Sequence, residues 1–445
     1  MSDEALRERY RIAIVADPQL TDWMSYHQSG LLLALVETYT DIYMKRSFNR
    51  MHASLRPDAV LFLGDLNDGG RDSYGETFDK NSNRFFEKVF ETNVRLYVAG
   101  NHDVGFGNTL VRPSVARFKR VFGSINYEIE VGNHSLVVLD TLALSSDVRD
   151  IREESQQFLT QMKNEKPTLP RILFTHVPLF RLDTTYCGDA RETEQLIINR
   201  NGLQFQNMVN APLSRQILRG IQPDMVFSGD DHDWCEIAHS LDGTLTPEVT
   251  LPTFSFAQGI QQPGFVMLSL YNPEHKGSAD SVARPSEDTT FAYEECMLPN
   301  QMLIYMCYIA LLAFSLNCIL IQRYRWMMRG RRHLAERSVL LRWTDSSTCP
   351  SDSDATPQGS TTATAISSQR QQQQQSPAQQ DRLNDEYGGS GSPGYFENAV
   401  VGRKQKKNVW PLLSSIYWKM SVWDLWNIVR YVVPFYAFLF VVSII

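Results

Sequence analysis

Five short apolar runs, each followed directly by residues that can bind a metal, constrain the fold of this chain more than any other feature. The runs lie at residues 12–16, 59–63, 94–99, 172–175 and 224–228. Helix-like segments such as residues 48–55 and 82–91 separate them. Alternating strands and helices are typical of α/β folds, in which ligands gather at the carboxyl ends of the strands. The pattern therefore predicts an α/β domain with one polar site at those ends.

The residues after the runs are the candidates for that site. They are Asp17 and Gln19, then Asp65, then Asn101, His102 and Asp103, then His176, and finally Asp230 and His232. Each one alone has an ordinary explanation, because an aspartate after a strand is usually a turn former or a helix cap. A lone histidine is more often a satisfied core residue than a ligand. The ordered set of five is hard to explain as turns, so we interpret it as a metal site.

This order resembles the calcineurin-like metallophosphoesterases, whose pattern is D-x-H, GD, GNH[DE], H and GHxH. The chain has DPQ at 17–19, GD at 64–65, GNHD at 100–103, His176, and GDDH at 229–232. Gln19 and Asp230 stand where the general pattern has histidine. The blocks DPQL, GDLNDGGR, GNHDVGFG and GDDHDWC look like the membrane-bound branch that remodels glycosylphosphatidylinositol (GPI) anchors, which includes the fungal cell-division-control phosphoesterases. The resemblance implies a β-sandwich flanked by helices.

The resemblance also implies a mechanism that uses two divalent ions, most often Mn²⁺. Asp65 would bridge the two ions, with Asp17, Gln19 and His232 on the first and Asn101, His176 and Asp230 on the second. A hydroxide held between the ions would attack phosphorus, since paired cations lower the pKa of a bound water. His102 would be the general acid, and Asp103 would orient its ring. The expected reaction removes ethanolamine phosphate from a mannose of the GPI glycan.

Gln19 and Asp230 each replace an imidazole nitrogen by an oxygen-bearing group. Oxygen ligands favour harder ions such as Mn²⁺ and Mg²⁺ over zinc. A neutral amide is a weak ligand, however, so Gln19 has the alternative of hydrogen-bonding a metal-bound water.

Residues around these positions have weaker claims. Asp68 and Arg71 are candidates to contact the substrate phosphate, because arginine suits phosphate through its two-pronged geometry. A solvated turn at Gly69 and Gly70 is the alternative. We expect Asp140, Asp231 and Asp233 to cap or support rather than to bind metal, and residues 258–265 to line the pocket.

The second half of the chain predicts membrane attachment. Residues 302–322 begin with twenty uncharged residues, enough to cross a bilayer as a helix. The arginines that follow, at 323, 325, 329, 331 and 332, mark the cytoplasmic side, which places the catalytic domain in the lumen. Because residues 1–11 are hydrophilic, we expect an N-terminal anchor to be missing from this sequence. The sequon at Asn133 suits a lumenal turn, though such triplets also occur by chance.

These features divide the chain into five parts. A catalytic domain at 1–290 precedes the transmembrane helix at 302–322, a basic then Ser/Thr/Gln-rich disordered loop at 323–408, an interfacial aromatic helix at 409–428, and a second membrane segment at 429–445, which is short enough to be truncated. We expect a multi-pass protein of the endoplasmic reticulum or Golgi membrane.

Charge and cysteine content limit the partners. The formal net charge of −7 argues against a nucleic-acid partner, which usually meets a basic face. The six cysteines have no zinc-type spacing, and the sequence leaves open whether Cys187 and Cys235 form a disulfide. The expected partners are a GPI glycolipid or GPI-anchored protein and the membrane. The alternatives are a phosphoesterase for a phosphoprotein, nucleotide or phospholipid headgroup, or a metal-free membrane scaffold.

Overall fold

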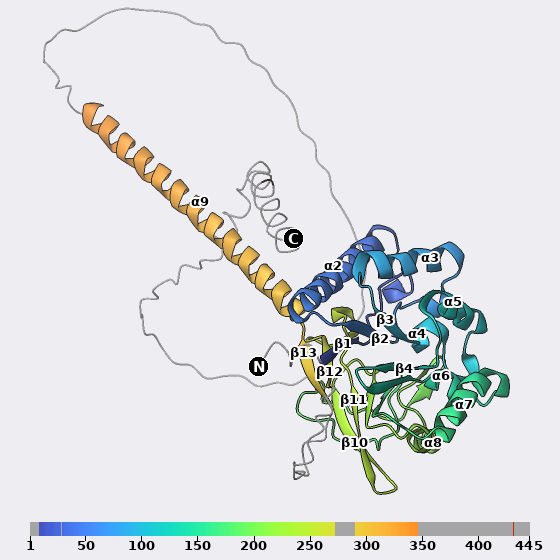
Figure 1. Cartoon of the computed structure of the whole chain (residues 1–445). Coiled ribbons are helices and arrows are strands. Elements are labelled where there is room, and N and C mark those ends of the chain that lie inside the picture. The colour runs from blue at the N-terminus through green and yellow to red at the C-terminus, as the bar shows by residue number, and fades with distance from the viewer. Residues whose placement is uncertain (1–8, 28, 272–289, 346–429, 431–445) are drawn as a thin grey trace, which may run out of the picture. The chain divides into compact units, whose positions relative to one another are not determined.

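The computed structural model describes residues 9–27, 29–271, 290–345 and 430 (Figure 1). It divides the chain into two compact units, Met1–Leu311 and Leu312–Ile445. The predicted interfacial helix at 409–428 and second membrane segment at 429–445 lie outside the described residues apart from Arg430, as does the predicted loop beyond residue 345.

The first unit contains two mixed sheets. The first sheet has the strand order β13-β12-β1-β2-β3, and its strands are β1 (Arg9–Val15), β2 (Ala59–Leu63), β3 (Arg95–Val98), β12 (Gly264–Tyr271) and β13 (Phe291–Met297). Strands β1, β2 and β3 are parallel, with Ile12 opposite Ala59 and Val60 opposite Arg95. The two late strands are antiparallel additions at one edge.

The second sheet has the order β10-β11-β9-β6-β5-β4. Its strands are β4 (Tyr127–Val131), β5 (His134–Val138), β6 (Arg171–Phe174), β9 (Met225–Ser228), β10 (Cys235–Leu241) and β11 (Thr244–Thr250). The central strands β5, β6, β9 and β11 are parallel. A small hairpin of β7 (Asn201–Gly202) and β8 (Phe205–Gln206) lies apart from both sheets in the pairing pattern.

Helices complete the layers. They are α2 (Gly30–Leu55), α3 (Gly75–Asn83), the π-helical turn η3 (Arg84–Val89), α4 (Asn101–Val104), α5 (Arg112–Phe122), α6 (Thr141–Leu144), α7 (Arg149–Asn164), α8 (Ala211–Ile221) and α9 (Gln301–Asp345), with 3-10 turns η1 (Ser25–His27), η2 (Gly70–Asp72), η4 (Gly107–Thr109) and η5 (Phe256–Gln258).

Two apolar layers hold the sheets in place. Side chains such as Ile14, Leu61, Phe174 and Phe227 form a buried cluster between the two sheets. On the other side of the first sheet, Phe62 packs with aromatic residues of the flanking segments, such as Phe48 and Phe90. Strand β2 is therefore buried on both faces, which is why it reads as a continuous apolar run. The prediction of an α/β sandwich flanked by helices is confirmed for this unit.

The strands begin and end close to where the apolar runs placed them. The run at 59–63 is β2 itself, and the other parallel strands differ from the runs by a few residues at most. The predicted strand ends are therefore real strand ends, and the polar residues after them start loops.

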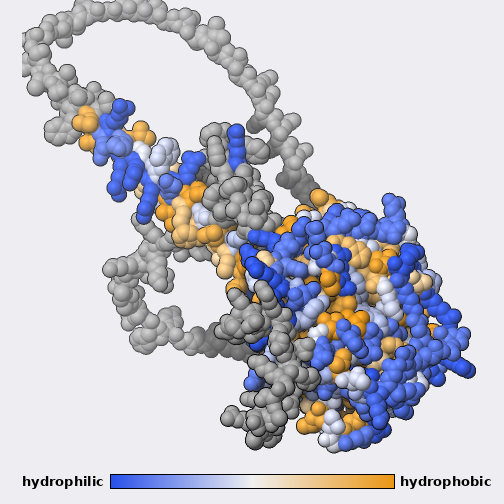
Figure 2. All heavy atoms as spheres, in the orientation of Figure 1, coloured by the Kyte–Doolittle hydropathy of each residue, from blue (hydrophilic) through white to orange (hydrophobic). Residues whose placement is uncertain are grey.

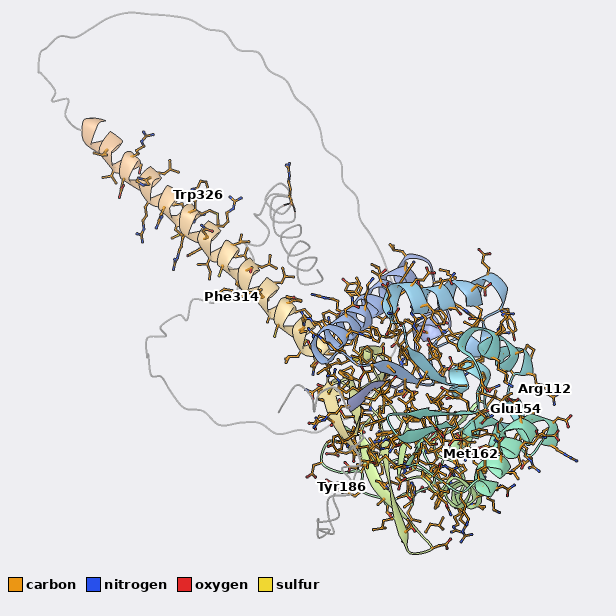
Figure 3. All side chains as sticks on the ribbon, viewed as in Figure 1. Arg112, Glu154, Met162, Tyr186, Phe314 and Trp326 are labelled. Carbon is orange, nitrogen blue, oxygen red and sulfur yellow. A yellow bond between two sulfur atoms is a disulfide. The ribbon has the colours of Figure 1, made fainter. Side chains whose placement is uncertain are left out.

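Helix α9 is the one helix in the described part of the chain that is long and apolar enough to cross a membrane, with a mean hydropathy of 2.2 over its best window. Figure 2 shows hydrophobic residues along its first part and hydrophilic ones further on. Phe314 and Trp326 project outward from it (Figure 3), and their side chains are 66% and 69% exposed. Residues 323–345, which we expected to belong to the disordered loop, instead continue α9 to Asp345, because this basic segment is rich in the strong helix formers Arg, Leu and Met.

Candidate metal centre

The predicted ligands meet at one edge, where the parallel strands of both sheets end. Asp17, Asp65 and Asn101 follow β1, β2 and β3, while His176 follows β6, and Asp230 and His232 follow β9. Five of the seven predicted ligands have the positive φ angles that non-glycine residues seldom adopt: Asp17, Gln19, Asp65, Asp230 and His232. Such backbone strain costs of order 1–3 kcal/mol per residue and clusters at functional sites.

His176 lies at the centre of the cluster. Its Nδ1 is 2.9 Å from the Leu63 carbonyl oxygen, to which a neutral ring donates. Nε2 of the same ring faces Oδ1 of Asn101 at 3.1 Å, Oδ1 of Asp65 at 3.2 Å and Oδ1 of Asp230 at 3.6 Å. Burial would lower the pKa of His176, but Asp65 and Asp17 raise it well above its usual value, so without a cation the ring is protonated and donates from Nε2. A divalent cation would take the place of that proton, and a hydrogen bond from the other ring nitrogen to a carbonyl is how proteins orient a metal-binding histidine.

Asp65 connects the two halves of the cluster. One carboxylate oxygen accepts from the His102 backbone N–H at 2.9 Å, and the other accepts from Nε2 of Gln19, also at 2.9 Å. Asp65 is 1% exposed. Burial would raise the pKa of Asp65, but His176 and His102 lower it below its usual range, so the carboxylate stays ionised. An ionised carboxylate with both oxygens in the cluster suits the bridging role that the sequence predicts.

Gln19 contributes its amide nitrogen rather than its oxygen to this cluster. Nε2 donates to Asp65 and lies 3.2 Å from Nε2 of His232. Metal binding through Oε1 therefore requires the amide to flip, because the NH₂ group has no lone pair to give. In the present arrangement Gln19 cross-links Asp65 and His232.

The donor set fits a pair of divalent cations. Ligand atoms of Asp17, Asp65 and His176 all lie within 4.8 Å of one another, and the three residues are buried. Burial, with Asp65 and Asp230 close by, raises the pKa of Asp17 well above its usual value. Burial, with Asp65 nearby, raises the pKa of Asp230 to about 7. Buried carboxylates of this kind are paired with cations or bind metals, and here they outnumber the histidines that could balance them.

His102 is oriented by Asp68, which corrects the expectation that Asp103 would do so. Nδ1 of His102 lies 2.6 Å from the Asp68 carbonyl oxygen and 3.1 Å from its carboxylate. Burial would lower the pKa of His102, but Asp65 and Asp68 raise it to about 10. Nε2 of the same ring is 4.0 Å from the Asp65 carboxylate, so the ring lies beside the metal-binding residues.

Asp103 instead fixes the backbone under the site. Its carboxylate accepts from the N–H groups of Gly100 at 3.0 Å and Leu66 at 3.0 Å, and more weakly from Asn67 at 3.4 Å. Burial, with Asp65 nearby, raises its pKa to about 7. The adjacency of His102 and Asp103 in the chain suggested a contact between their side chains, but adjacent residues on a short helical turn such as α4 point in different directions.

Among the weaker candidates, Arg71 lies beside the site, whereas three aspartates support the surrounding structure. Arg71 donates from Nη1 to the Asn101 carbonyl at 3.2 Å, so its guanidinium lies beside the site. Asp140 caps α6 by accepting from Leu142 and Ala143, as expected for a supporting residue. Asp231 pairs with Arg191 at 2.6 Å, and Asp233 accepts from Thr193 at 2.8 Å. Both aspartates are therefore structural supports, as expected.

The segment between β6 and α8 contributes residues that the sequence did not single out. Gln204, in the β7–β8 hairpin, accepts from Nδ2 of Asn101 at 3.0 Å through its carbonyl oxygen, and so orients a predicted ligand. The open question of the Cys187–Cys235 pair is settled, since the two form a disulfide that ties this segment to β10. No local pattern marks Gln204, because its contact joins residues 103 positions apart.

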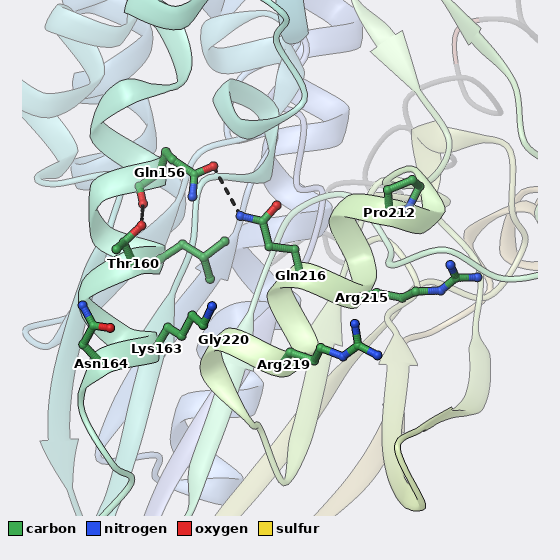
Figure 4. Close-up of a pocket in the computed structure, with 10 residues that line it drawn as sticks. Gln156, Thr160, Lys163, Asn164, Pro212, Arg215, Gln216, Arg219 and Gly220 are labelled. Carbon is green, nitrogen blue, oxygen red and sulfur yellow. Dashed lines mark hydrogen bonds between the residues drawn. The ribbon is translucent and has the colours of Figure 1, made fainter.

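A cavity of about 530 Å³ opens beside His232. It is lined from the same segment by Thr193, Gln195 and Arg200, and from the turn after η5 by Gly259 and Ile260. Of residues 258–265, which we expected to line the pocket, Gln258, Gly259 and Ile260 line this cavity and residues 261–265 do not. A second hollow, of about 520 Å³ between α7 and α8, is lined by polar side chains such as Lys163 and Arg215 (Figure 4). None of the predicted site residues lines it.

Comparison with known protein families decides the class of this site. The family model described as calcineurin-like phosphoesterase matches residues 10–234, which include all of the predicted ligands. The chain belongs to the calcineurin-like phosphoesterase family. The buried group of Asp17, Asp65 and His176 fits the metal site expected of a metal-dependent phosphoesterase.

Among curated proteins, the chain is similar to cell division control protein 1 of Saccharomyces cerevisiae, with 35% identity over 318 residues, or 69% of this chain and 65% of the yeast protein. It is 28% identical to metallophosphoesterase 1 of Pongo abelii over 61% of this chain and 68% of that protein. The chain thus spans somewhat less than two thirds of the yeast relative's length.

Among solved structures, a dimetal phosphatase from Danio rerio matches with a TM-score of 0.36 and 15% identity, over 59% of this chain and 93% of that chain. A phosphopantetheinyl hydrolase from Mycobacterium tuberculosis matches with a TM-score of 0.31 and 12% identity, over 55% and 90% of the two chains.

Proposed function

We propose that this chain is a membrane-anchored two-metal phosphodiesterase that removes ethanolamine phosphate from a mannose of the GPI glycan. The observation that carries the proposal is the convergence of Asp17, Asp65, Asn101, His176, Asp230 and His232 around one buried point, with His102 at its rim. The narrower substrate assignment is supported by the resemblance of four sequence blocks to the GPI-remodelling branch and by the two curated relatives.

Each side chain has a role that follows from its contacts. Asp17, Asp65 and Asp230 supply the negative charge that holds the cations, and His176 supplies a nitrogen oriented by the Leu63 carbonyl. Bound cations would supply Lewis-acid polarisation of the phosphoryl group and a lowered pKa for the attacking water. His102 donates the proton to the departing alkoxide, and Asp68 keeps that ring charged and oriented. Mn²⁺ is the expected ion, because oxygen donors outnumber nitrogen donors in the cluster.

The cavity beside His232 supports a sugar as the group next to the phosphate. Its polar lining includes the neutral side chains Thr193, Gln195, Asn207 and Gln258, which can both donate and accept hydrogen bonds. Sugar hydroxyls need partners of this kind. Its volume lies within the range of small-ligand sites. We therefore assign the cavity to the glycan portion of the substrate.

The compartment is inferred from three features of the chain. The Cys187–Cys235 disulfide is typical of an oxidising compartment. The arginines after the apolar part of α9 favour a cytoplasmic location for that end of the helix, and so a lumenal catalytic unit. Asn133, in the turn between β4 and β5, is exposed and has a positive φ angle, which fits a glycosylated turn. The endoplasmic reticulum or Golgi membrane satisfies all three.

Hydrolysis of a generic aryl phosphodiester by the full chain in detergent tests the reaction class. We expect activity with added Mn²⁺, loss of activity with EDTA, and at least a 1,000-fold lower kcat in Asp65→Ala, on the order of what loss of a central electrostatic group costs. Full activity in Asp65→Ala would contradict the two-metal mechanism.

Mass spectrometry of GPI glycans from cells that lack the gene tests the substrate. An unchanged ethanolamine-phosphate content would mean that the chain is a phosphoesterase for another substrate. A chain without bound metal or activity would instead be a scaffold.

A further inference from the structure

Helix α2 has two halves with different surroundings. Its buried residues, from Thr40 to Met51, pack on the first sheet. The ten residues before Thr40 cover about 15 Å at ~1.5 Å per residue, and none of them is buried. The first half of α2 therefore extends beyond the packed body of the catalytic unit.

That first half is apolar where a soluble helix end would be polar. Leu31, Leu32 and Leu35 are 79%, 52% and 46% exposed. Residues 29–36 include no charged side chain, and the first charged residue, Glu37, is directed toward Arg84 at 3.8 Å. Clustered exposed apolar residues of this kind mark an interaction surface.

The middle of α2, at Tyr39 and Tyr43, lies beside the start of α9. The Tyr43 hydroxyl donates to the Pro299 carbonyl oxygen at 2.9 Å, and its ring packs on Phe256 at 5.0 Å. Phe256 in turn contacts Tyr305 of α9 at 6.4 Å between ring centroids, and Tyr39 lies close enough to Tyr305 to interact with it electrostatically. Residues up to Leu311 belong to the same compact unit as α2, so this arrangement is internal to that unit (Figure 1).

Tyr305 lies inside the apolar run that begins at Met302, so the membrane boundary of α9 falls just before it. Because Tyr39 is a neighbour of Tyr305, the turns of α2 that precede Tyr39 are next to that boundary. A helix end that carries exposed leucines and no charged side chain has the composition of one that enters the headgroup and acyl region of a bilayer. Lipid therefore explains both the composition and the position of this surface.

We propose that residues Leu31–Leu35, here called the α2 tip, insert into the lipid bilayer beside α9 and form a second membrane contact of the catalytic unit. The inference rests on α9 crossing the bilayer, and it does not depend on the substrate. The α2 tip is also connected to the catalytic site, because the segment that joins them carries Ser25, whose hydroxyl donates to the Asp68 carboxylate. Two attachment points would hold the catalytic unit in one orientation relative to the membrane, whereas a single helix would allow the unit to rotate.

Photocrosslinking of the full chain in phosphatidylcholine proteoliposomes tests the proposal. A photoreactive p-benzoylphenylalanine takes the place of Leu32, of Ile309 in α9, or of Leu245, which is 69% exposed near the start of β11. All three positions are exposed, so the replacements preserve folding. We expect lipid adducts by mass spectrometry at positions 32 and 309, at least fivefold above position 245.

Three results would overturn the proposal. Adducts at 309 with position 32 at the level of 245 would show that α9 enters lipid while the α2 tip does not. A covalent dimer formed from position 32 would show that a second copy covers the surface. No lipid adduct at 309 would remove the membrane span on which the inference rests. None of these outcomes alters the phosphodiester hydrolysis test.

Discussion

At the scale of single residues, the two departures from the general family pattern behave differently. Asp230 keeps its carboxylate 3.6 Å from His176, in the position of a ligand. Gln19 directs its NH₂ group at Asp65 and His232, and so holds two ligands together in this state. The order of ligands could be predicted from the sequence because each follows a strand whose apolar pattern is local. The partner of His102 could not be predicted, because Asp68 lies 34 positions away in the sequence and contacts His102 from a turn whose shape no local pattern determines.

The Asp68–His102 contact leads to the first prediction. Asp68→Asn removes the charge that keeps His102 protonated, so we expect kcat to fall about 10- to 100-fold for a substrate with an alkoxide leaving group. A p-nitrophenyl diester, whose leaving group needs no proton, should lose less than threefold. Asp72→Asn is the matched control, because that carboxylate is 41% exposed and pairs only with Arg71 among its described partners. Equal losses for both leaving groups would show that Asp68 does not act through the general acid.

At the scale of elements, the second sheet depends on a buried ionic cluster that the sequence did not reveal. Glu248 of β11 contacts Arg181 at 3.0 Å, His239 at 2.5 Å and the Ser228 hydroxyl at 2.7 Å. The side chains of Glu248 and Arg181 are at most 1% exposed. These partners come from three separate segments, so only the folded chain brings them together.

Glu248→Gln should destabilise the catalytic unit by about 3–5 kcal/mol, because it leaves the Arg181 charge buried without its partner. Burial would raise the pKa of Glu248, but Arg181 and His239 lower it to about 2. A lowered pKa in the folded state means that this stabilisation is present above the unfolded pKa, near 4.5, and is lost as pH falls toward 2. The Tm difference between wild type and variant should therefore be largest at pH 7 and shrink below pH 4.

Thermal unfolding of the detergent-solubilised chain across pH provides the measurement. Glu130→Gln is the control, since Glu130 is exposed on β4 of the same sheet, and it should change the stability by less than about 0.5 kcal/mol. A Tm difference that stays constant from pH 7 to pH 3 would contradict the assignment of an ionised Glu248.

The segment between β6 and α8 is the other element that the site requires. The Cys187–Cys235 disulfide closes a loop of 48 positions, which corresponds to about 4 kcal/mol of loop-closure entropy in the unfolded chain. The double variant Cys187→Ser/Cys235→Ser should lower the Tm and raise KM, because the same segment carries Gln204 and part of the wall of the cavity beside His232. Cys296→Ser, at a free cysteine, should change neither. An unchanged KM in the double variant would separate the disulfide from substrate binding.

At the scale of the whole molecule, one sequence encodes a soluble-type sandwich and a helix that is long and apolar enough to cross a membrane. The sandwich was predictable because its parallel strands are buried on both faces and read as apolar runs. The length of α9 was not, because charged residues such as arginine are good helix formers and give no signal for where a helix leaves the membrane. The position of the α2 tip next to α9 also required the structure, since about 270 residues separate Leu31 from Met302.

The most direct test of the account is the metal content of the purified full chain, measured by inductively coupled plasma mass spectrometry after exposure to Mn²⁺ and removal of free ions. We predict about two Mn²⁺ per chain in the wild type, matching the two-ion clamp of such phosphoesterases. Asp65→Ala should retain less than half of that amount and the exposed control Asp72→Asn all of it. A wild-type chain that holds no stoichiometric metal, or an Asp65→Ala chain that holds as much as the wild type, would contradict the central claim that Asp65 bridges a dimetal centre.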